Sequence, residues 1–407
     1  MFTNQLGFSL VELALFVIAL GLLIPITVLF VECCTALLPN RFKPLKVKGE
    51  RPRISVLMPA HNEALGISAT LQTITTQLTH QDRLIVIADN CTDETAAIAQ
   101  AFGATVLERH DLHRRGKGYA LDYGLRFMEV DPPDVVVMMD ADCIVHPGAI
   151  ERIACVASTL RRPVQANYRM APPANPEPKD LISALAVIVN NLVRPTGLVR
   201  LGWPCPLQGT GMAFPWAIIR EVPLASGNLV EDLKLGLDLT IAGHPPVFCP
   251  DAKVTAVLPQ QQAAKEQRTR WEHGSLQTLL TQVPRLLKLF VHQKRFELLA
   301  SALDLSIPPL SLLVMLWAST MGGAILAGVL GAAWMPAIVL GIAGLLIIVS
   351  IVGAWAKYGR GYMPIQTLLA VPFYILWKIP LYLMFLVRPE TKWVRTRRNA
   401  VNVLSSQ

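Results

Sequence analysis

The feature that most limits how this chain can fold is a set of apolar segments too long for an ordinary soluble core. Residues 7–31 carry one charged side chain, Glu12, and residues 298–356 are almost entirely apolar apart from a break around 330–336. About 20 consecutive apolar residues cross the ~30 Å hydrocarbon layer of a bilayer. The first segment therefore predicts one membrane span, and the second predicts two.

Charge in the flanks orients the first span. A cleaved signal peptide is the alternative, but the first eleven residues contain no Lys or Arg, so an uncleaved span is favoured. The flank that follows is basic, with Arg41, Lys43, Lys46, Lys48, Arg51 and Arg53. The positive-inside rule then places residue 40 onward in the cytosol and the amino terminus outside.

Two further apolar runs are less regular. Residues 181–201 are interrupted by Asn190, Asn191, Arg194 and Pro195, which favours a helix on the membrane surface or against a sheet over a full span. Residues 363–387 contain three prolines and Lys378, and a span there would put the basic tail outside. We therefore expect a re-entrant or interfacial segment at 363–387.

Composition excludes several classes of protein. Of 407 residues, 52% are hydrophobic and 16% are charged, against roughly 25% charged in soluble domains, which argues against a disordered chain or a coiled coil. The net charge is +8, but the basic residues cluster beside apolar segments, where a membrane surface explains them better than nucleic acid. The seven cysteines form no CxxC pair, so we expect reduced thiols rather than zinc or disulfides.

Residues 51 to about 170 have the pattern of an α/β domain. Three short apolar runs, 54–58, 84–88 and 135–139, alternate with helical stretches near 66–79, 93–102, 117–129 and 147–159. Continuous Val/Ile runs are typical of strands buried on both faces of a parallel sheet. Such sheets bind ligands at the carboxyl ends of their strands, so functional residues are expected directly after each run.

The third run ends at Asp140-Ala141-Asp142, which suggests a metal site. Two carboxylates one residue apart can both approach Mg²⁺, which binds one or two carboxylates together with substrate phosphates. A helix N-cap beside a solvated acid explains one aspartate but not both. After the first two runs come Pro59-Ala60-His61-Asn62-Glu63 and Asp89-Asn90-Cys91-Thr92-Asp93, which could instead be turns and helix caps. Arg115-Gly116-Lys117-Gly118 then opens a helix whose N–H groups suit a phosphate, without the spacing of a Walker loop.

The order of these motifs resembles the membrane-embedded family 2 glycosyltransferases, which include cellulose, chitin-oligosaccharide and hyaluronan synthases. The resemblance covers roughly 51–275 and adds Glu231-Asp232 and a QxxRW motif at Gln267, Arg270 and Trp271. It implies an α/β fold of the GT-A type with a mostly parallel sheet, flanked by transmembrane helices. The family's Thr-Glu-Asp triplet reads Val230-Glu231-Asp232 here, so the threonine is missing while both acids remain.

The resemblance also implies residue roles. The donor side would comprise Pro59, His61, Glu63, Asp89, Lys117, Asp140, Gln267, Arg270 and Trp271, and the acceptor side Gln208, Gly209, Thr210, Glu231 and Trp271. Asp89 would contact the base, and Asp140 with Asp142 would hold Mg²⁺ or Mn²⁺. Asp232 would be the general base, against the alternative of an N-cap. Polar packing for His61 and membrane-surface anchoring for Trp271 are further alternatives.

Together these features predict an inverting, metal-dependent transferase that moves a sugar from a nucleotide sugar to a growing polysaccharide at the cytosolic face of the plasma (inner) membrane. UDP is the leading candidate for the donor nucleotide. One base and no carboxylate nucleophile indicate single displacement. The alternatives are single addition to a lipid-linked acceptor, a nucleotide-sensing transporter or channel, and an inactive scaffold. The predicted domains are an N-terminal helix (1–40), a cytosolic catalytic domain (41–295), C-terminal helices (296–390) and a basic cytosolic tail (391–407).

Overall fold

The computed structural model describes residues 2–39, 50–225, 229–258, 261–361 and 363–387, with side chains described from residue 10 onward except at 261–264. The described residues form two compact units. A helical unit contains 2–39, 177–197 and 275–387, and a sheet unit contains 50–176 and 198–274. The basic flank at 41–48 and the predicted tail at 391–407 lie outside the described residues. The predicted domain boundaries stay predictions.

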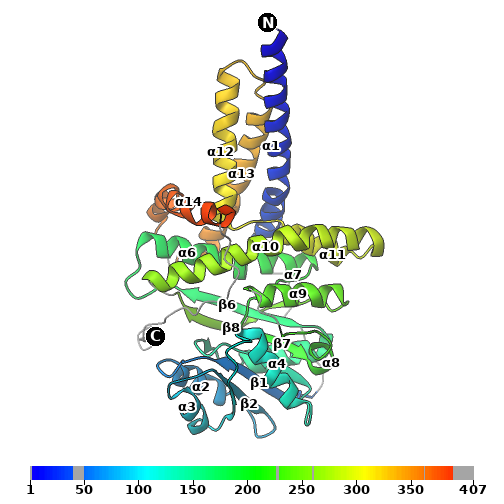
Figure 1. The fold of residues 1–407 in the computed structure, drawn as a ribbon, viewed down its shortest axis with the longest axis vertical. Coiled ribbons are helices and arrows are strands. Elements are labelled where there is room, and N and C mark those ends of the chain that lie inside the picture. Colours follow the sequence, from blue (N-terminus) through cyan, green and yellow to red (C-terminus); the bar gives the residue numbers. More distant parts are fainter. Residues whose placement is uncertain (1, 40–49, 226–228, 259–260, 362, 388–407) are drawn as a thin grey trace. The chain divides into compact units, whose positions relative to one another are not determined.

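The sheet unit is built on eight strands, β1 (Ile54–Ala60), β2 (Arg83–Asp89), β3 (Thr105–Arg109), β4 (Val135–Met138), β5 (Ile144–Val145), β6 (Val164–Ala171), β7 (Met212–Pro215) and β8 (Val247–Val257). Their order is β3-β2-β1-β4-β7-β6-β8-β5. Figure 1 labels β1, β2, β6, β7 and β8 of this sheet. The first four strands in this order are parallel, as predicted. β7 runs antiparallel to both β4 and β6, so the sheet as a whole is mixed.

The three apolar runs of the sequence are confirmed as β1, β2 and β4, and every residue of β4 is buried. Their register aligns Leu57 of β1 with Ile85 of β2 and with Met138 of β4. Parallel strands in register end at one edge of the sheet. The loops that follow β1, β2 and β4 therefore start close together.

Helices cover this sheet: α2 (Ile67–Thr75), α3 (Thr95–Ala101), α4 (Lys117–Met128), α5 (Ala149–Leu160), α8 (Trp216–Ile219) and α9 (Glu231–Ile241). α4 lies on β1 and β2, where Leu121 and Leu125 pack into a core with Leu57 and Ile87. A Cβ at Gly124 would lie 2.9 Å from Ile87 Cδ1, so only glycine allows this close approach. The packing fixes the first residue of α4, Lys117.

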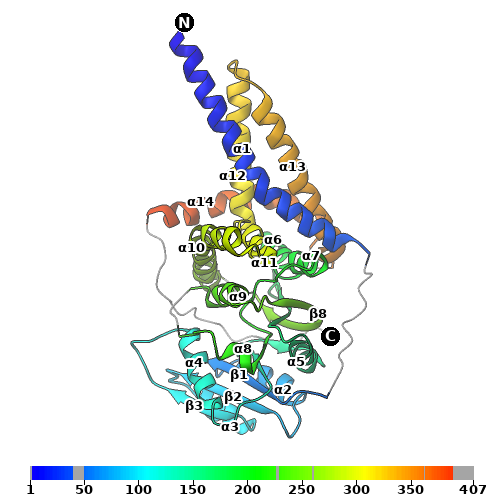
Figure 2. The same ribbon diagram turned by 90° about the vertical axis from the view of Figure 1, so that its right-hand side faces the viewer.

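The helical unit contains α1 (Phe2–Leu37), α6 (Pro178–Ile188), the π-helix η1 (Val189–Val193), α11 (Phe296–Leu305), α12 (Leu310–Val329), α13 (Met335–Ala354), the π-helix η2 (Trp355–Gly359), the 3₁₀-helix η3 (Ile365–Ala370) and α14 (Val371–Val387). Two helices belong partly to each unit, α7 (Arg194–Leu201) and α10 (Gln261–Gln293). α1, α12 and α13 run alongside one another, whereas α14 runs crosswise to α12 and α13 (Figures 1 and 2).

Five helical stretches among the described residues are long and apolar enough to cross a membrane: Leu10–Leu37, Pro178–Leu201, Leu310–Val329, Met335–Gly359 and Ile365–Val387. The predicted pair within 298–356 corresponds to α12 and α13, with the break at 330–334. The crosswise direction of α14 agrees with an interfacial or re-entrant segment at 363–387.

A buried ion-pair triad explains the charged interruption near residue 194. Arg194 Nε donates to Glu32 Oε2 at 2.8 Å, and Arg194 Nη2 donates to Asp304 Oδ1 at 2.7 Å. Glu32 is fully buried, and its Oε1 has no hydrogen-bond partner in the described part of the chain. A Cβ at Gly197 would lie 2.9 Å from Glu32 Cα, so the backbones of α1 and α7 approach closely here. Arg194 therefore joins three elements of the helical unit.

Candidate active site

The predicted site residues gather at the edge where β1, β2 and β4 end. Asp140 follows β4, and the amide N–H of Met139 before it donates to Leu57 O at 3.1 Å. Lys117 reaches the same point from the start of α4, where its ammonium forms an ion pair with Asp140 and donates to Gly209 O at 2.6 Å. Strand end, helix start and the loop at 208–211 therefore meet at one ammonium group.

Two more carboxylates face this ammonium. Glu231 and Asp232 form the first turn of α9 and are half-buried. Burial disfavours the charge on Lys117, but the carboxylates of Asp140, Glu231 and Asp232 outweigh burial and raise the pKa of Lys117. Three carboxylates around one cation leave an excess of negative charge, which favours binding of a further cation.

The same environment raises the pKa of both acids at the start of α9. Burial, with repulsion from Asp232, raises the pKa of Glu231 from 4.5 to about 7. Burial also raises the pKa of Asp232, although Lys117 opposes the rise. Asp232 Oδ1 accepts the Leu233 N–H at 2.8 Å, and a Cβ at Gly209 would lie 3.1 Å from Asp232 Oδ2. Asp232 Oδ2 is thus the oxygen directed toward Gly209.

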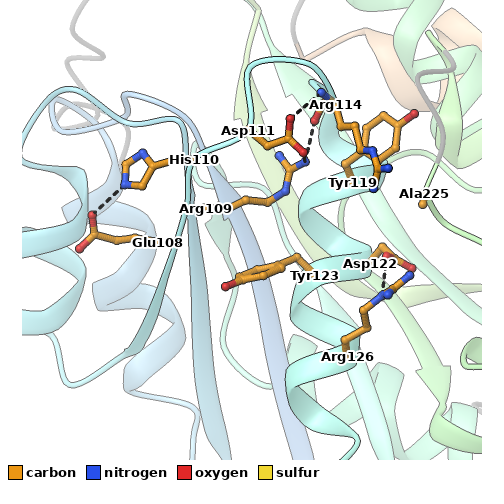
Figure 3. Close-up of a pocket in the computed structure, with 10 residues that line it drawn as sticks. All are labelled: Glu108, Arg109, His110, Asp111, Arg114, Tyr119, Asp122, Tyr123, Arg126 and Ala225. Carbon is orange, nitrogen blue, oxygen red and sulfur yellow. Dashed lines mark hydrogen bonds and ion pairs between the residues drawn. The ribbon is translucent and has the colours of Figure 1, made fainter.

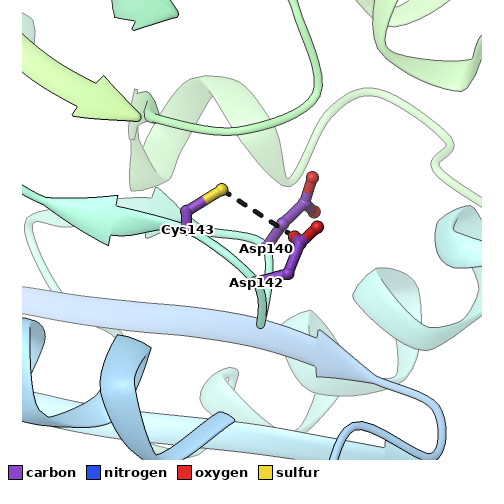
Figure 4. A group of neighbouring side chains, drawn as sticks. All are labelled: Asp140, Asp142 and Cys143. Atoms are coloured by element: carbon purple, nitrogen blue, oxygen red, sulfur yellow. Dashed lines mark hydrogen bonds between the residues drawn. The ribbon is translucent and has the colours of Figure 1, made fainter. Parts of the chain in front are cut away.

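Asp140, Asp142 and Cys143 form a possible metal-binding group, in which one potential ligand atom of each lies within 4.8 Å of the others. The two carboxylates point to the same side of the loop (Figure 4). Burial raises the pKa of the Cys143 thiol well above its usual range. The carboxylate oxygens suit a hard divalent cation such as Mg²⁺ or Mn²⁺.

The loop with the predicted acceptor residues is tied to this group. Thr210 Oγ1 accepts the Asp140 N–H at 3.0 Å. Gln165 of β6 is fully buried and holds the loop from behind, because its Nε2 donates to Thr210 O at 2.9 Å and its Oε1 accepts the Gln208 N–H at 2.9 Å. The sequence did not single out Gln165, since it lies in a strand without an apolar run. The acceptor roles of Gln208, Gly209 and Thr210 stay predictions.

The residues predicted for the nucleotide base lie at the ends of β1 and β2. Asp89 ends β2, and Arg109 Nη1 donates to Asp89 Oδ1 at 2.6 Å. His61 Nδ1 lies 2.6 Å from Asp89 O, which fits polar packing. The Glu63 N–H donates to Thr95 Oγ1 at 2.8 Å, and Pro59 pairs within the β1–β2 ladder. The sequence missed Arg109 because nothing in a single polar strand marks it as a partner of Asp89.

The QxxRW residues lie on α10. Gln267 is 7% exposed, and its Oε1 has no hydrogen-bond partner among the described residues, while Arg270 and Trp271 are half-buried. Gly274 on the same helix packs on Val230, since a Cβ there would lie 3.0 Å from Val230 Cγ1. This contact brings α10 to the residue that precedes Glu231. The donor and acceptor roles of the motif stay predictions.

A cavity of about 370 Å³ opens beside the Asp89–Arg109 pair, lined by Glu108, Arg109, His110, Asp111, Arg114, Tyr119, Asp122, Tyr123, Arg126 and Ala225 (Figure 3). Several of its charges are already paired: Arg126 Nε lies 2.9 Å from Asp122 Oδ2, and Arg109 Nη2 lies 3.3 Å from Asp111 Oδ2. All seven cysteines of the chain are free in the structure.

Comparisons with known proteins agree with this arrangement. The chain is 27% identical over 256 residues to the probable glycosyltransferase YdaM of Bacillus subtilis, covering 59% of each protein. It is 32% identical over 103 residues to the uncharacterized protein MJ1222 of Methanocaldococcus jannaschii, covering 25% of this chain and 41% of that protein. The chain thus spans less than two thirds of the length of these curated relatives.

The fold is similar to that of a solved structure, the mannosyltransferase PcManGT from Pyrobaculum calidifontis in complex with GDP-Man and Mn²⁺. The TM-score is 0.55 at 18% identity, over 91% of this chain and 99% of that one. This likeness confirms the predicted GT-A fold. The family model described as "Glycosyltransferase like family 2" matches residues 52–274. Because the match covers more than half of the chain, the chain belongs to this family.

Proposed function

We propose that this protein is a metal-dependent, inverting glycosyltransferase that moves a sugar from a nucleotide sugar to a growing polysaccharide, with UDP as the leading candidate for the donor nucleotide. The observation that carries the proposal is the meeting of Lys117, Asp140, Gly209 and Asp232 at the strand ends. Membership of the family supports the reaction class. The relatives support a nucleotide-sugar donor, since one solved neighbour holds GDP-Man and Mn²⁺.

On the donor side, Asp140 and Asp142 hold the cation and Lys117 meets the diphosphate. A bound Mg²⁺ or Mn²⁺ supplies Lewis-acid neutralisation of the leaving diphosphate. Lys117 adds a second positive charge at the same place, and its raised pKa keeps it charged. Gln267, Arg270 and Trp271 support the diphosphate and the acceptor sugar from α10, and Asp89 receives the base.

On the acceptor side, Asp232 is the general base. Oδ2 takes the proton of the acceptor hydroxyl as that oxygen bonds to the anomeric carbon, while the bond from this carbon to the diphosphate oxygen breaks. The raised pKa of Asp232 makes its carboxylate a better proton acceptor near neutral pH. One displacement by one acceptor inverts the anomeric configuration. Glu231 beside it contacts the acceptor and raises the local negative potential.

The membrane setting is part of the proposal. Five stretches of the described residues can cross a bilayer by length and composition. The basic residues after the first stretch favour a cytosolic catalytic unit, in a multi-pass protein of the plasma (inner) membrane. Nucleotide sugars are then available at the site, and the acceptor is a glycan near the lipid surface.

A second candidate is a non-processive enzyme that adds one sugar to a lipid-linked acceptor, such as a polyprenyl-diphosphate glycan or a glycolipid. The observation that favours it is the direction of α14, which runs crosswise and so does not extend the group formed by α1, α12 and α13. Among the described helices with long apolar stretches, α1, α12 and α13 are the ones that run alongside one another. Three helices enclose little space for a polymer. Product size distinguishes the candidates: a ladder of oligomers supports polymer synthesis, and a single added sugar supports the second candidate.

The test is release of nucleoside diphosphate by the purified full chain with a panel of UDP- and GDP-sugars, with and without Mn²⁺ or Mg²⁺. We expect turnover that EDTA abolishes and that Asp140→Asn, Asp142→Asn and Asp232→Asn each reduce at least about 100-fold. Asp251→Asn is the matched control, because Asp251 is exposed and, among the described residues, forms an ion pair with Arg152 alone, at 3.3 Å. Wild-type turnover in all three site variants would overturn the assignment.

A further inference from the structure

The carboxylate assigned to the nucleotide base is held by an ion pair that donor binding alone does not explain. Asp89 and Arg109 are the last residues of β2 and β3, and they are direct partners in the parallel register of these strands. Each is 8% exposed, and Arg109 Nη1 donates to Asp89 Oδ1 at 2.6 Å. Burying such a pair costs desolvation free energy, so its place next to the base position invites a functional explanation.

Arg109 is fixed on its other sides as well. Its Nη2 donates to Arg114 O at 2.7 Å and lies 3.3 Å from Asp111 Oδ2. Its guanidinium carbon lies 5.9 Å from the centre of the Tyr119 ring, within the range of a cation–π contact. Figure 3 shows Arg109 directed toward Asp111 and the Arg114 loop. An arginine held this way is a rigid support for Asp89 rather than a mobile phosphate ligand.

The two oxygens of Asp89 differ in consequence. Oδ1 accepts from Arg109 Nη1 and from Asn90 Nδ2 at 2.9 Å. Oδ2 has no hydrogen-bond partner in the part of the chain that the structure describes. An ionised carboxylate only accepts hydrogen bonds, so Oδ2 is an acceptor of fixed direction.

We propose that Arg109 determines nucleobase specificity by holding Asp89 as a fixed, ionised acceptor, so that the donor site selects bases with a ring N–H, uracil or guanine, over cytosine and adenine. The inference rests on the proposed function, in which Asp89 receives the base. Uracil N3 and guanine N1 carry a hydrogen, whereas cytosine N3 and adenine N1 are themselves acceptors. Two acceptors face to face leave a buried polar group unpaired, which is how a site rejects an analogue strongly. Arg109 is a positioning residue, since it acts through Asp89.

Removing the guanidinium changes the donor–acceptor character of Asp89. Burial already raises the pKa of Asp89, and Arg109 opposes that rise, as does His61 across from β1, while Asp111 adds to it. Without Arg109 the carboxyl binds a proton more readily and can donate as well as accept. Discrimination against cytosine and adenine then weakens, and it weakens further as the pH falls and the carboxyl binds a proton.

The experiment measures inhibition constants of UDP, GDP, CDP and ADP against donor turnover by the full chain with Mn²⁺, for wild type and Arg109→Met. We expect wild type to bind UDP or GDP at least 100-fold more tightly than CDP or ADP. In Arg109→Met this ratio of inhibition constants should fall at least tenfold, and the KM for the donor should rise by a larger factor than kcat falls. Arg126→Met is the control. It removes an arginine of the same cavity whose side chain is 71% exposed and pairs with Asp122, so the ratio stays unchanged.

A second pair of variants keeps the test decisive if Arg109→Met folds poorly. Arg109→Lys retains the positive charge and should partly retain the ratio of inhibition constants. In an Asp89→Asn background, a further change at position 109 should have little additional effect on this ratio, because Arg109 acts through Asp89. An unchanged ratio in folded Arg109→Met overturns the inference. Wild type that turns over donor but binds all four nucleotides equally also overturns it and leaves the proposed function intact. Wild type that binds no nucleotide overturns both.

Discussion

Replacing Gly209 by alanine tests the central geometry with one methyl group. Gly209 has a φ of +86°, and its carbonyl accepts the Lys117 ammonium at 2.6 Å. A Cβ there would lie 3.1 Å from Asp232 Oδ2 and 3.5 Å from Lys117 Nζ. The methyl group therefore enters the space between the proposed base and the proposed phosphate ligand. The carboxylate must move by a few tenths of an ångström to admit it.

Two separate costs are expected, and a matched control separates them. The left-handed backbone costs a non-glycine residue about 1–2 kcal/mol, which lowers the melting temperature by about 2–8 °C in a unit of this size. Gly103 has a φ of +81°, and nothing lies within 4 Å of its added Cβ. Gly103→Ala therefore carries the backbone cost alone. Displacing a catalytic group by about 1 Å costs about 100-fold in rate, or about 2.7 kcal/mol, so a shift of a few tenths of an ångström costs up to that amount. This cost belongs to Gly209→Ala alone.

The assay compares melting temperature and kcat of the full chain for both variants. We expect similar losses of melting temperature in Gly209→Ala and Gly103→Ala. The loss of kcat should be tenfold or more, up to about 100-fold, in the first and less than threefold in the second. Equal kcat values in the two variants would refute the reasoning, because the backbone cost would then account for everything. A normal kcat in Gly209→Ala with a lowered melting temperature would place the reacting atoms away from Asp232 Oδ2.

Two further predictions concern buried charge. The pKa of Glu231 rises from 4.5 to about 7 on folding, which corresponds to up to about 3 kcal/mol of stability that wild type loses as the pH rises through this range. Glu231→Gln should therefore have a higher melting temperature than wild type at pH 8 in EDTA, and nearly the same melting temperature at pH 4.5. An equal difference in melting temperature at both pH values would contradict the assignment. Arg194→Met leaves Glu32 and Asp304 buried without their cation and should lower the unfolding free energy by about 3–5 kcal/mol. Adding Glu32→Gln and Asp304→Asn to this variant should recover most of the loss. A triple variant as unstable as the single variant would show that the triad contributes through packing rather than charge.

Strands were predictable where burial on both faces produces a continuous apolar run. β1, β2 and β4 have such runs, and the structure confirms them. β3 was missed because it is an edge strand with mostly exposed or half-buried residues. β6 was missed for the opposite reason: Gln165 and Asn167 are buried, but their amides are hydrogen-bonded within the sheet unit, so polarity did not mean exposure.

Site residues were predictable where the chemistry needs a charged side chain directly after a strand or at a helix start. Lys117, Asp140 and Asp232 met that condition, and the structure brings them together. Arg109 and Gln165 were missed because each acts by holding another group, and neither has a fixed spacing to its partner. The signal for Arg109 is the β2–β3 register, which pairs it with Asp89 and is known only once β3 is recognised.

The interrupted apolar segment at 181–201 shows that the cost of a charge in an apolar segment depends on residues elsewhere in the chain. A lone charge counts against a span, because Arg at the centre of a membrane helix costs about 2.5–3.5 kcal/mol. In the structure Arg194 is paired with acids 162 and 110 positions away in the sequence, so the cost depends on other elements. The predicted apolar segments 7–31 and 298–356 contain only the acids Glu12 and Asp304, and Glu32 and Glu297 directly flank them. Matching charges between apolar segments would have left four candidates for Arg194, and two of them are its partners.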